Sequence, residues 1–321
     1  MLYYLGLDVG GTHARLKIAD EKGRELTAKE GLGGTMPVLG YEETCRRYRL
    51  LIEPALNELG LTPTQCGGLC LGAAGIDSDE LRAQYLRFLT EMGFPPCCVT
   101  AVNDCELLLS LSDGPCVALV SGTGSIAVGR AKPGSAVVRS GGWSYVIGDE
   151  GSAVDLSLCA MRLVLMHWDG RLSCPFLAAA FERDPEVSSP EKLVKWCHGN
   201  IAEKDKLARF APLVEAAAKE GDCAAEALLR ASAGKLSDLA VSVANKLGFS
   251  EKQFTLLLWG SVLTQNETLR EMLIEDLRGH CRQANVCMPG TSALDCAVKL
   301  AMKSRADADL RMPGPGATDL A

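Results

Sequence analysis

The sequence predicts an α/β protein built from two related halves. In each half an apolar run ends at a tight turn of small residues: residues 5–12 read LGLDVGGT, and residues 118–125 read ALVSGTGS. The order strand, glycine turn, strand, turn, strand follows in both places. With 321 residues, 47% of them hydrophobic, the chain has enough apolar material for two cores. We therefore expect two domains that share one plan.

The first half begins with an apolar run at residues 3–9, which predicts a strand. After the glycine turn, residues 14–18 alternate between apolar and basic side chains, which predicts a second strand. A helical pattern of apolar residues ends at Gly60. The predicted strands of this half are residues 3–9, 14–18, 24–29, 67–71 and 99–102, and its predicted helices are residues 41–59, 81–92 and 106–111.

The second half restarts the plan at Cys116. A Lys-Pro-Gly turn at residues 132–134 separates two short strands. Residues 151–247 are mostly helical in pattern, with breaks expected near three prolines, Pro175, Pro185 and Pro190. The predicted strands are residues 116–120, 126–130, 136–139 and 254–259, and the later predicted helices are residues 267–278 and 293–302.

These elements define the expected domains. The N-terminal domain covers residues 1–113, and the helix at residues 293–303 could join it. The C-terminal domain covers residues 114–292 and contains the helical insertion. Residues 304–321 are rich in Pro, Gly, Ala and Asp and show no packing pattern, so we expect a disordered tail.

Composition limits the partners and the compartment. The net charge of -7 argues against a nucleic-acid surface, which usually shows a basic stripe. No apolar run approaches the roughly 20 residues of a membrane span, and Asp8 comes too early for a secretory signal. The 14 cysteines are scattered without a C-x-x-C pair, which favours reduced thiols packed as small apolar side chains. We expect a cytoplasmic protein without nucleic-acid or membrane partners.

The two glycine turns suit phosphate groups. Such a turn directs backbone N–H groups and a hydroxyl at one point. The G-x-G-x-x-G pattern and a Gly-Lys-Ser/Thr sequence are both absent from the turns, so neither the Rossmann nor the P-loop mode applies. A glycine turn between two antiparallel strands is a different phosphate cradle. One such turn in each half indicates a nucleotide held between two lobes.

Two carboxylates stand at predicted strand ends. Asp8 could hold Mg²⁺ through water or could bond the turn amides, and local sequence leaves both open. Asp104 could take the proton from an attacking hydroxyl, as phosphoryl-transfer enzymes often require. The alternative is a helix N-cap, which local sequence favours.

The segment at residues 141–152 reads GGWSYVIGDEGS and has neither helical nor strand periodicity. Such a loop usually has a function beyond connection. An aromatic ring beside a carboxylate is a common way to hold a sugar, and Trp143 and Asp149 supply this pair. Alternatively, Trp143 anchors the loop to the core, and Asp149 and Glu150 cap the following helix.

Five short motifs follow one another in an order more specific than any one of them. They are Asp8-Val9-Gly10-Gly11-Thr12, Asn103-Asp104, Ser121-Gly122-Thr123-Gly124-Ser125, Gly141-Gly142-Trp143 with Gly148-Asp149-Glu150-Gly151-Ser152, and Leu258-Trp259-Gly260-Ser261-Val262. Over roughly residues 3–302, the chain resembles the BadF/BadG/BcrA/BcrD ATPase family. Within it, the chain resembles the N-acetylglucosamine kinase branch of the actin/hexokinase/Hsp70 ATPase superfamily.

The resemblance implies two ribonuclease-H-like (actin-like ATPase) domains that close a central cleft on ATP, Mg²⁺ and an amino sugar. It implies a sugar kinase for N-acetylglucosamine, glucosamine or a related sugar, with Asp104 as general base and Asp8 at the metal. The phosphate loops would be Gly10, Gly11 and Thr12 and then Gly122, Thr123, Gly124 and Ser125. The adenosine loop would be Gly260 and Ser261, and the sugar contacts would be Thr35, Asn103, Gly142, Trp143 and Asp149.

The chain also departs from the family pattern. Thr35 stands where these kinases usually have an Asn, and Ala74 lies in a segment that lacks an expected serine, so the identity of the sugar stays open. Two alternatives from other classes remain. One is an ATPase that activates a 2-hydroxyacyl-CoA dehydratase or a benzoyl-CoA reductase through an iron–sulfur cluster shared between subunits, which needs suitably placed cysteines. The other is a non-catalytic sugar sensor. A homodimer is also left open.

Overall fold

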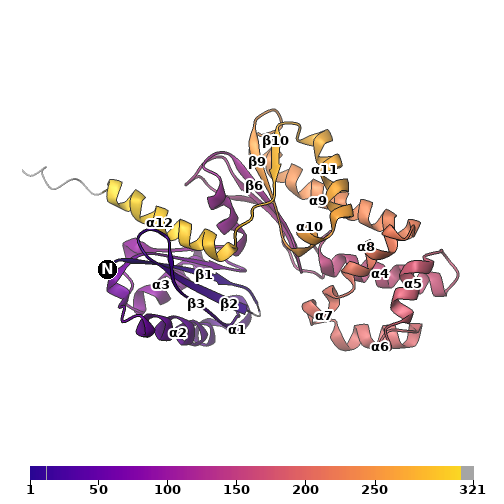
Figure 1. The fold of residues 1–321 in the computed structure, drawn as a ribbon, viewed down its shortest axis with the longest axis horizontal. Helices are drawn as coiled ribbons and strands as arrows, with labels where there is room; N and C mark the ends of the chain where they lie inside the picture. The colour runs from indigo at the N-terminus through magenta and orange to yellow at the C-terminus, as the bar shows by residue number, and fades with distance from the viewer. Residues whose placement is uncertain (12, 312–321) are drawn as a thin grey trace, which may run out of the picture. The chain divides into compact units, whose positions relative to one another are not determined.

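The computed structural model describes residues 1–11 and 13–311, and the chain divides into two compact units (Figure 1). Unit 1 consists of Met1–Leu111 and the segment that starts at Gly290, and unit 2 is Ser112–Pro289. Each unit contains a five-stranded mixed sheet. The strand orders, β3-β2-β1-β4-β5 and β10-β9-β6-β7-β8, follow one plan: an antiparallel three-strand meander continues into two parallel strands.

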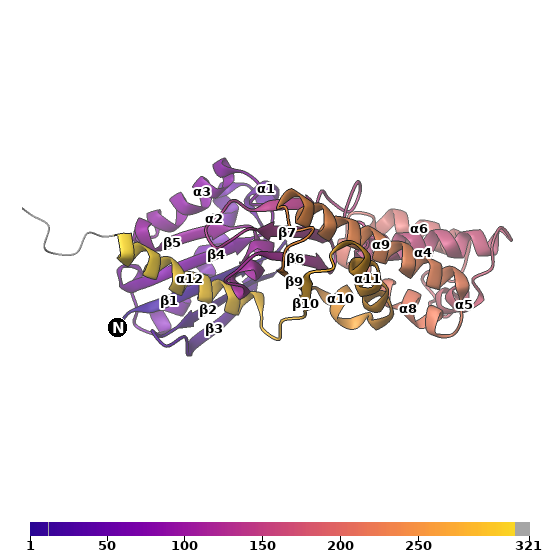
Figure 2. The same cartoon turned by 90° about the horizontal axis from the view of Figure 1, so that it is seen from above.

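The sheet of unit 1 separates two layers of helix (Figures 1 and 2). Odd-numbered residues of the first strand, such as Leu5 and Leu7, are buried in a core that α2 and α3 complete. On the other face, α12 packs so closely that a Cβ at Gly6 would lie 2.8 Å from the Val298 nitrogen. The strands are β1 (Tyr3–Val9), β2 (His13–Ala19), β3 (Glu25–Leu32), β4 (Cys66–Ala73) and β5 (Val99–Val102). The helices are α1 (Met36–Leu39), α2 (Tyr41–Glu58), η1 (Pro63–Gln65), α3 (Asp79–Glu91), η2 (Pro96–Cys98), η3 (Asp104–Leu111) and α12 (Ala293–Arg311).

The expectation of a disordered tail from residue 304 is wrong for the part that belongs to helix α12. The helix continues to Arg311, so residues 304–311 are helical and do not belong to a tail. These residues include neither Gly nor Pro, and Ala, Leu and Arg favour helix, so the backbone can continue the helix until it approaches Pro313. The remaining part of the expected tail, residues 312–321, lies outside the described residues.

Unit 2 combines its sheet with a helical insertion. The breaks expected near the three prolines are present, and Pro175 and Pro190 begin the helices that follow them, because the missing N–H of proline costs nothing in the first turn. The strands are β6 (Cys116–Ser121), β7 (Ser125–Arg130), β8 (Val138–Gly141), β9 (Phe254–Trp259) and β10 (Ala284–Cys287). The helices are α4 (Ala153–Trp168), α5 (Pro175–Glu182), α6 (Pro190–Asn200), α7 (Lys204–Ala208), α8 (Ala211–Lys219), α9 (Cys223–Lys246), α10 (Ser261–Gln265) and α11 (Glu267–His280).

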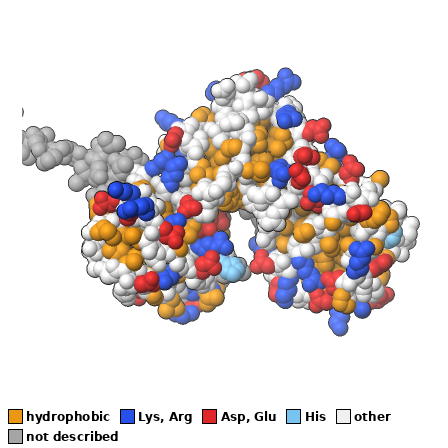
Figure 3. All heavy atoms as spheres, in the orientation of Figure 1, with side chains coloured by type: hydrophobic (Ala, Val, Ile, Leu, Met, Phe, Trp, Pro, Cys, Tyr) orange, Lys and Arg blue, Asp and Glu red, His pale blue; other side chains and the backbone are white. Residues whose placement is uncertain are grey.

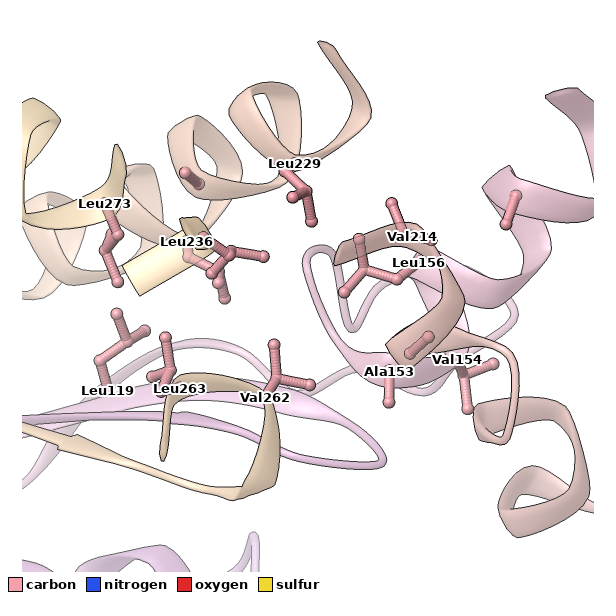
Figure 4. Close-up of a cluster of buried hydrophobic side chains, with 14 of the residues drawn as sticks. Leu119, Ala153, Val154, Leu156, Val214, Leu229, Leu236, Val262, Leu263 and Leu273 are labelled. Carbon is pink, nitrogen blue, oxygen red and sulfur yellow. The ribbon is translucent and has the colours of Figure 1, made fainter. Parts of the chain in front are cut away.

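One apolar core joins the sheet of unit 2 to these helices. Leu119 of β6 faces Leu263 of α10 in this core, and leucines of α9 and α11 lie above them (Figure 4). Ala153 and Leu156 at the start of α4 belong to the same cluster, beside Val214 of α8. The loops that follow β6 and β9 are therefore anchored to one packed core, which fixes them relative to α4 and α8.

On the face shown in Figure 3, basic and acidic side chains are interspersed over each unit and do not form a stripe of one sign. A search of the described helices finds none with the length and apolar character needed to cross a bilayer.

Candidate active site

The first group of predicted site residues lies at one edge of the unit 1 sheet. Asp8 of β1 pairs in register with Gly72 of β4, and Gly72 pairs with Val102 of β5. These three strands are parallel, so their carboxyl ends meet at the same edge. Asn103 and Asp104 directly follow β5. The strand ends of this unit therefore bring Asp8 and Asp104 to the edge where ligands bind in α/β sheets.

A glycine allows the close approach that places Asp104. The Leu107 side chain of η3 occupies the space that a Cβ at Gly72 would fill. Leu107 is fully buried there, so η3 lies directly over β4. Any side chain at position 72 would push η3, and with it Asp104, away from the strand ends.

The structure assigns the cap of η3 to Asn103. The Asn103 Oδ1 atom accepts a hydrogen bond from the Cys105 N–H at 3.2 Å, and its carbonyl accepts one from the Glu106 N–H at 2.9 Å. This is the turn that an Asn side chain forms with the amide two residues on. The Asp104 carboxylate accepts from the adjacent Cys105 N–H at 3.0 Å. The cap role that local sequence favours for Asp104 therefore belongs to its neighbour.

Two carboxyl groups influence each other at this edge. Burial, reinforced by the nearby charge of Asp8, raises the pKa of Asp104 from its ordinary 3.8 to about 6. Burial also raises the pKa of Asp8, against the opposing charge of Arg15. Arg15 lies across from Asp8 on β2. A carboxyl group with a pKa near 6 can accept a proton at neutral pH, as a general base must.

The first glycine turn is tied to the segment that carries Thr35. The Gly10 N–H donates to the His13 carbonyl at 2.9 Å, and the Gly10 carbonyl accepts from the Gly34 N–H at 3.0 Å. Thr35 is 4% exposed and makes no side-chain cap for α1. A Cβ at Gly11 would meet no atom within 4 Å, so this part of the turn is open. Thr12, which we expect to complete the phosphate loop, lies outside the described residues.

The second glycine turn is a tight hairpin held by two serines. Ser121 and Ser125 pair at its base, and the Gly122 N–H donates to the Gly124 carbonyl at 2.9 Å. The Ser121 hydroxyl donates to the Gly151 carbonyl at 2.9 Å, and the Ser125 hydroxyl donates to the Glu150 carbonyl at 2.7 Å. The hairpin is therefore fastened to the GDEGS end of the loop at residues 141–152.

Asp149 links this loop to the hairpin. Its carboxylate accepts hydrogen bonds from the backbone N–H groups of Ser125 and Ser144, and burial raises its pKa. A Cβ at Gly124 would lie only 2.9 Å from Asp149 Oδ2. Through its amide, which donates to Asp149, and its hydroxyl, which donates to the loop, Ser125 positions the hairpin. The cap of α4 comes from Ser152, whose Oγ accepts from the Asp155 N–H, so Asp149 does not cap this helix.

Trp143 does not anchor its loop to the core, because the side chain is 63% exposed. The Arg139 guanidinium carbon lies 4.1 Å from the centroid of the Trp143 ring. The same guanidinium donates to the carbonyls of Gly141 and Gly142, at 3.3 and 3.2 Å. Arg139 therefore stacks on the ring and fixes the backbone that carries it. Arg139 was missed from the sequence, although it lies only four residues before Trp143, because the contact depends on the positive φ angles of Gly141 and Gly142.

A cavity of about 230 Å³ adjoins the second hairpin within unit 2. Thr123 of the hairpin and Ser261 of α10 both line it. Gly260 lies directly against the Ser121 carbonyl, where a Cβ would overlap that atom. The predicted adenosine loop and the second phosphate loop therefore meet at one cavity. Its lining residues are Thr123, Ala153, Leu156, Ala208, Ala211, Pro212, Glu215, Ser261, Val262, Gln265 and Asn266.

Comparison with known proteins identifies the family. A match to the BadF/BadG/BcrA/BcrD ATPase family covers residues 5–298, nearly the whole chain. The chain belongs to this ATPase family. As a member of the family, it is a protein that uses ATP.

The relatives of this ATPase family member include sugar kinases. An N-acetylmuramic acid/N-acetylglucosamine kinase from Clostridium acetobutylicum is 28% identical, over 82% of this chain and 86% of that protein. An N-acetyl-D-glucosamine kinase from Dictyostelium discoideum is 24% identical, over 90% of this chain and 96% of that protein. A candidate N-acetylglucosamine kinase from Chromobacterium violaceum has a solved structure with a TM-score of 0.72 and 26% identity, over 94% of this chain and 99% of that one. The predicted fold class, two ribonuclease-H-like domains of the actin-like ATPase type, is confirmed.

Proposed function

We propose that this chain is an ATP-dependent kinase that phosphorylates a hydroxyl group of an amino sugar, such as N-acetylglucosamine or glucosamine. One observation carries the proposal. Asp104 lies at the strand-end edge of unit 1, directly after the capping residue Asn103, and burial raises its pKa to about 6. The curated relatives are named as kinases of N-acetylglucosamine, N-acetylmuramic acid and glucosamine, which supports an amino sugar as the acceptor. These names favour the kinase over the activator and sensor alternatives.

Asp104 accepts the proton of the attacking sugar hydroxyl in this proposal, because a general base must stand at the acceptor oxygen. In unit 2, the phosphate chain of ATP binds at the second hairpin. No hydrogen bond between described residues uses the backbone N–H groups of Thr123 and Gly124, so both can donate to phosphate oxygens. Gly10 and Gly11 are proposed as the matching loop in unit 1, and Thr12 keeps the role that its sequence position predicts.

Mg²⁺ is the cofactor that we propose with ATP, and Asp8 is the residue that would hold it. The fit rests on two nearby carboxyl groups whose pKa values are raised by burial. A bound cation would stabilise their ionised forms and so offset this effect of burial. Among the side chains that the structure describes, those of residues 1–11 and 13–303, no group of three His, Cys, Asp or Glu is placed for a metal. Mg²⁺ usually keeps several waters and needs only one or two carboxylates beside the substrate phosphates. When bound, it would neutralise phosphate charge.

The sugar is proposed to lie against the exposed ring of Trp143, since an aromatic face suits the apolar face of a sugar. Gly142 places the ring and Asp149 holds the loop closed on the hairpin. In unit 1, Thr35 and Asn103 stay proposed sugar contacts, and Asn103 also shapes the turn that presents Asp104.

Removing Arg139 tests the sugar platform. We expect Arg139→Ala to raise KM for the sugar about 5- to 10-fold, because the ring loses its stacked cation and two carbonyls lose their donor. The Kd of ATP should stay unchanged. Steady-state kinetics and quenching of tryptophan fluorescence by sugar report the two effects. Arg171→Ala, which removes an exposed arginine paired with Asp169, is the matched control. An unchanged KM for the sugar would show that Arg139 does not position Trp143.

The pH profile tests the state of Asp104. The base works only when deprotonated, so kcat/KM for MgATP should fall about tenfold per pH unit below the pKa of about 6. Above pH 7, where Asp104 is deprotonated, kcat/KM should no longer depend on the titration of this residue. Calorimetric measurement of ATP binding over the same range separates catalysis from affinity. A profile that stays flat to pH 4.5 would mean that Asp104 does not act as the base.

A panel of sugars tests the function itself. ADP release should depend on the presence of N-acetylglucosamine, glucosamine or a related amino sugar, and the panel ranks them. Because Thr35 stands where the kinases of the family usually have an Asn, the panel and not the family pattern decides the ranking. ADP release at the same rate with every sugar and with none would count against a kinase.

A further inference from the structure

We infer that Glu215 selects adenine over guanine as the base of the nucleotide, an inference that rests on the proposed function. The cavity beside the second hairpin is where the argument starts. Its apolar walls include Ala153 and Leu156 of α4 and Val262 of α10 (Figure 4). Ala211 of α8 also lines it. Thr123 of the phosphate hairpin stands at the same cavity. A flat heteroaromatic group attached to a phosphate chain matches this combination.

Glu215 is the acidic side chain among the lining residues. Glu215 lies three residues after Pro212 and four residues after Ala211 on α8, so it is a neighbour of both on the helix surface. The Glu215 side chain is 14% exposed. The carboxylate thus stands at the wall of the apolar cavity and not on the open surface of the helix.

Three donors hold one oxygen of this carboxylate. Glu215 Oε1 accepts from the Thr268 N–H at 3.1 Å, from the Thr268 hydroxyl at 3.2 Å and from Lys219 Nζ at 3.0 Å. Burial alone would raise the pKa of Glu215, but the bonds from Thr268 and Lys219 outweigh it and lower the pKa. The group is therefore ionised at neutral pH, fixed in orientation, and able only to accept hydrogen bonds.

The second oxygen is available to a ligand. Among the hydrogen bonds between described residues, none uses Glu215 Oε2. A purine base that enters the cavity meets Glu215 Oε2, which can only accept a hydrogen bond, so the base must supply the donor. Adenine presents an amino group at its 6-position, whereas guanine and hypoxanthine present a carbonyl oxygen there. Two facing acceptors in a partly buried site repel, and the carboxylate then loses water without gaining a partner.

Glu215 is the lining side chain that can only accept hydrogen bonds, whereas the other polar side chains of the cavity also carry donors. Asn266 is the N-cap of α11, where its Oδ1 accepts from the Leu269 N–H at 2.9 Å. Gln265 is exposed, and its amide can donate or accept, so it can pair with either base. Glu215 is therefore the residue whose chemistry distinguishes a 6-amino from a 6-oxo purine.

Calorimetry with nucleoside triphosphates, without any sugar, tests this assignment. We expect wild-type protein to bind ATP about 100-fold more tightly than ITP, which has a 6-oxo group in place of the 6-amino group. GTP should bind as weakly as ITP, and the triphosphate of unsubstituted purine riboside should lie between ATP and ITP. Equal affinities for ATP and ITP would overturn the inference. This series needs no variant, so a folding defect cannot obscure it.

Glu215→Gln provides the second arm, since its amide keeps an acceptor for Thr268 and offers a donor to a 6-oxo group. The ratio of the ITP and ATP dissociation constants should fall at least 10-fold, with Glu220→Gln at the exposed end of α8 as the matched control. An unchanged ratio in folded Glu215→Gln protein would contradict the inference. Binding is measured without sugar, so a preserved preference for ATP without any sugar phosphorylation would refute the proposed function and leave the role of Glu215 intact.

Discussion

The Asp104→Asn variant is expected to turn over about 10²–10⁴-fold more slowly than the wild type, with the Kd of ATP preserved. Asn keeps the shape of the side chain and can still accept from the Cys105 N–H, so η3 should stay in place. What it loses is the ability to take a proton from the sugar hydroxyl. A coupled assay for ADP release measures the turnover, and calorimetry measures nucleotide binding. Near-normal turnover would reject Asp104 as the base.

The same substitution should stabilise the fold at high pH. The folded-state pKa of Asp104, about 6, lies above its ordinary 3.8, so the fold favours the protonated group. This contribution to stability is fully present below pH 4 and is lost as the pH rises through 6. At pH 8 the wild type therefore carries a cost of about 3 kcal/mol that the Asp104→Asn variant does not carry.

Thermal unfolding at two pH values checks this sign. The Tm of Asp104→Asn should exceed that of the wild type at pH 8, and the difference should shrink toward pH 4. Asp238→Asn, at an exposed position of α9, is the control and should show no such dependence. A lower Tm at pH 8 for Asp104→Asn would mean that the carboxylate stabilises unit 1, contrary to the raised pKa.

Gly124→Ala is expected to lower kcat/KM for both substrates about 10²-fold. The new methyl group would lie 2.9 Å from Asp149 Oδ2, so the carboxylate must move. Its bonds from the Ser125 and Ser144 N–H groups then break, which shifts the phosphate hairpin and the tryptophan loop together. A displacement near 1 Å is enough for a loss of this size. Gly114→Ala is the control, because a Cβ there meets no atom within 4 Å.

A double-mutant cycle identifies the cause of this loss. In the Asp149→Ala background the clashing oxygens are absent, so Gly124→Ala should cost much less than it does in the wild type. Kinetics of the four proteins give the coupling energy. Additive losses would show that Gly124 and Asp149 act independently, and the link between the hairpin and the loop would then not matter to catalysis.

Strands that form a clear apolar run between turns could be predicted from sequence, whereas a short strand without such a run could not. The bounds of β1, β5 and β9 coincide with the predicted strands, because each is an apolar run that stops at small or polar residues. Strand β10, which pairs with β9, was missed because Asn285, a residue type depleted in strands, interrupts its short apolar run. The breaks expected near the three prolines are confirmed, because proline is favoured at the first position of a helix and not within it, and Pro175 and Pro190 begin the helices that follow the breaks.

The candidate site could also be predicted only in part from sequence. Sequence could place Asp8 and Asp104 at strand ends, because the end of an apolar run is a local signal. It favoured Asp104 as the cap of η3, because Asp is a good cap, and it missed the cap that Asn103 forms. The engagement of Ser125 and the donors around Glu215 depend on residues distant in sequence, which only the folded chain brings together. The stacking of Arg139 on Trp143, four residues on, depends on the conformation of the glycines between them.

Detection of a phosphorylated amino sugar tests the central claim most directly. The protein is incubated with ATP, Mg²⁺ and N-acetylglucosamine or glucosamine, and the products are measured by mass spectrometry together with ADP. We expect a sugar monophosphate and ADP in equal amounts, with both products nearly absent for Asp104→Asn. ADP released with inorganic phosphate and no sugar phosphate from any amino sugar would contradict the account.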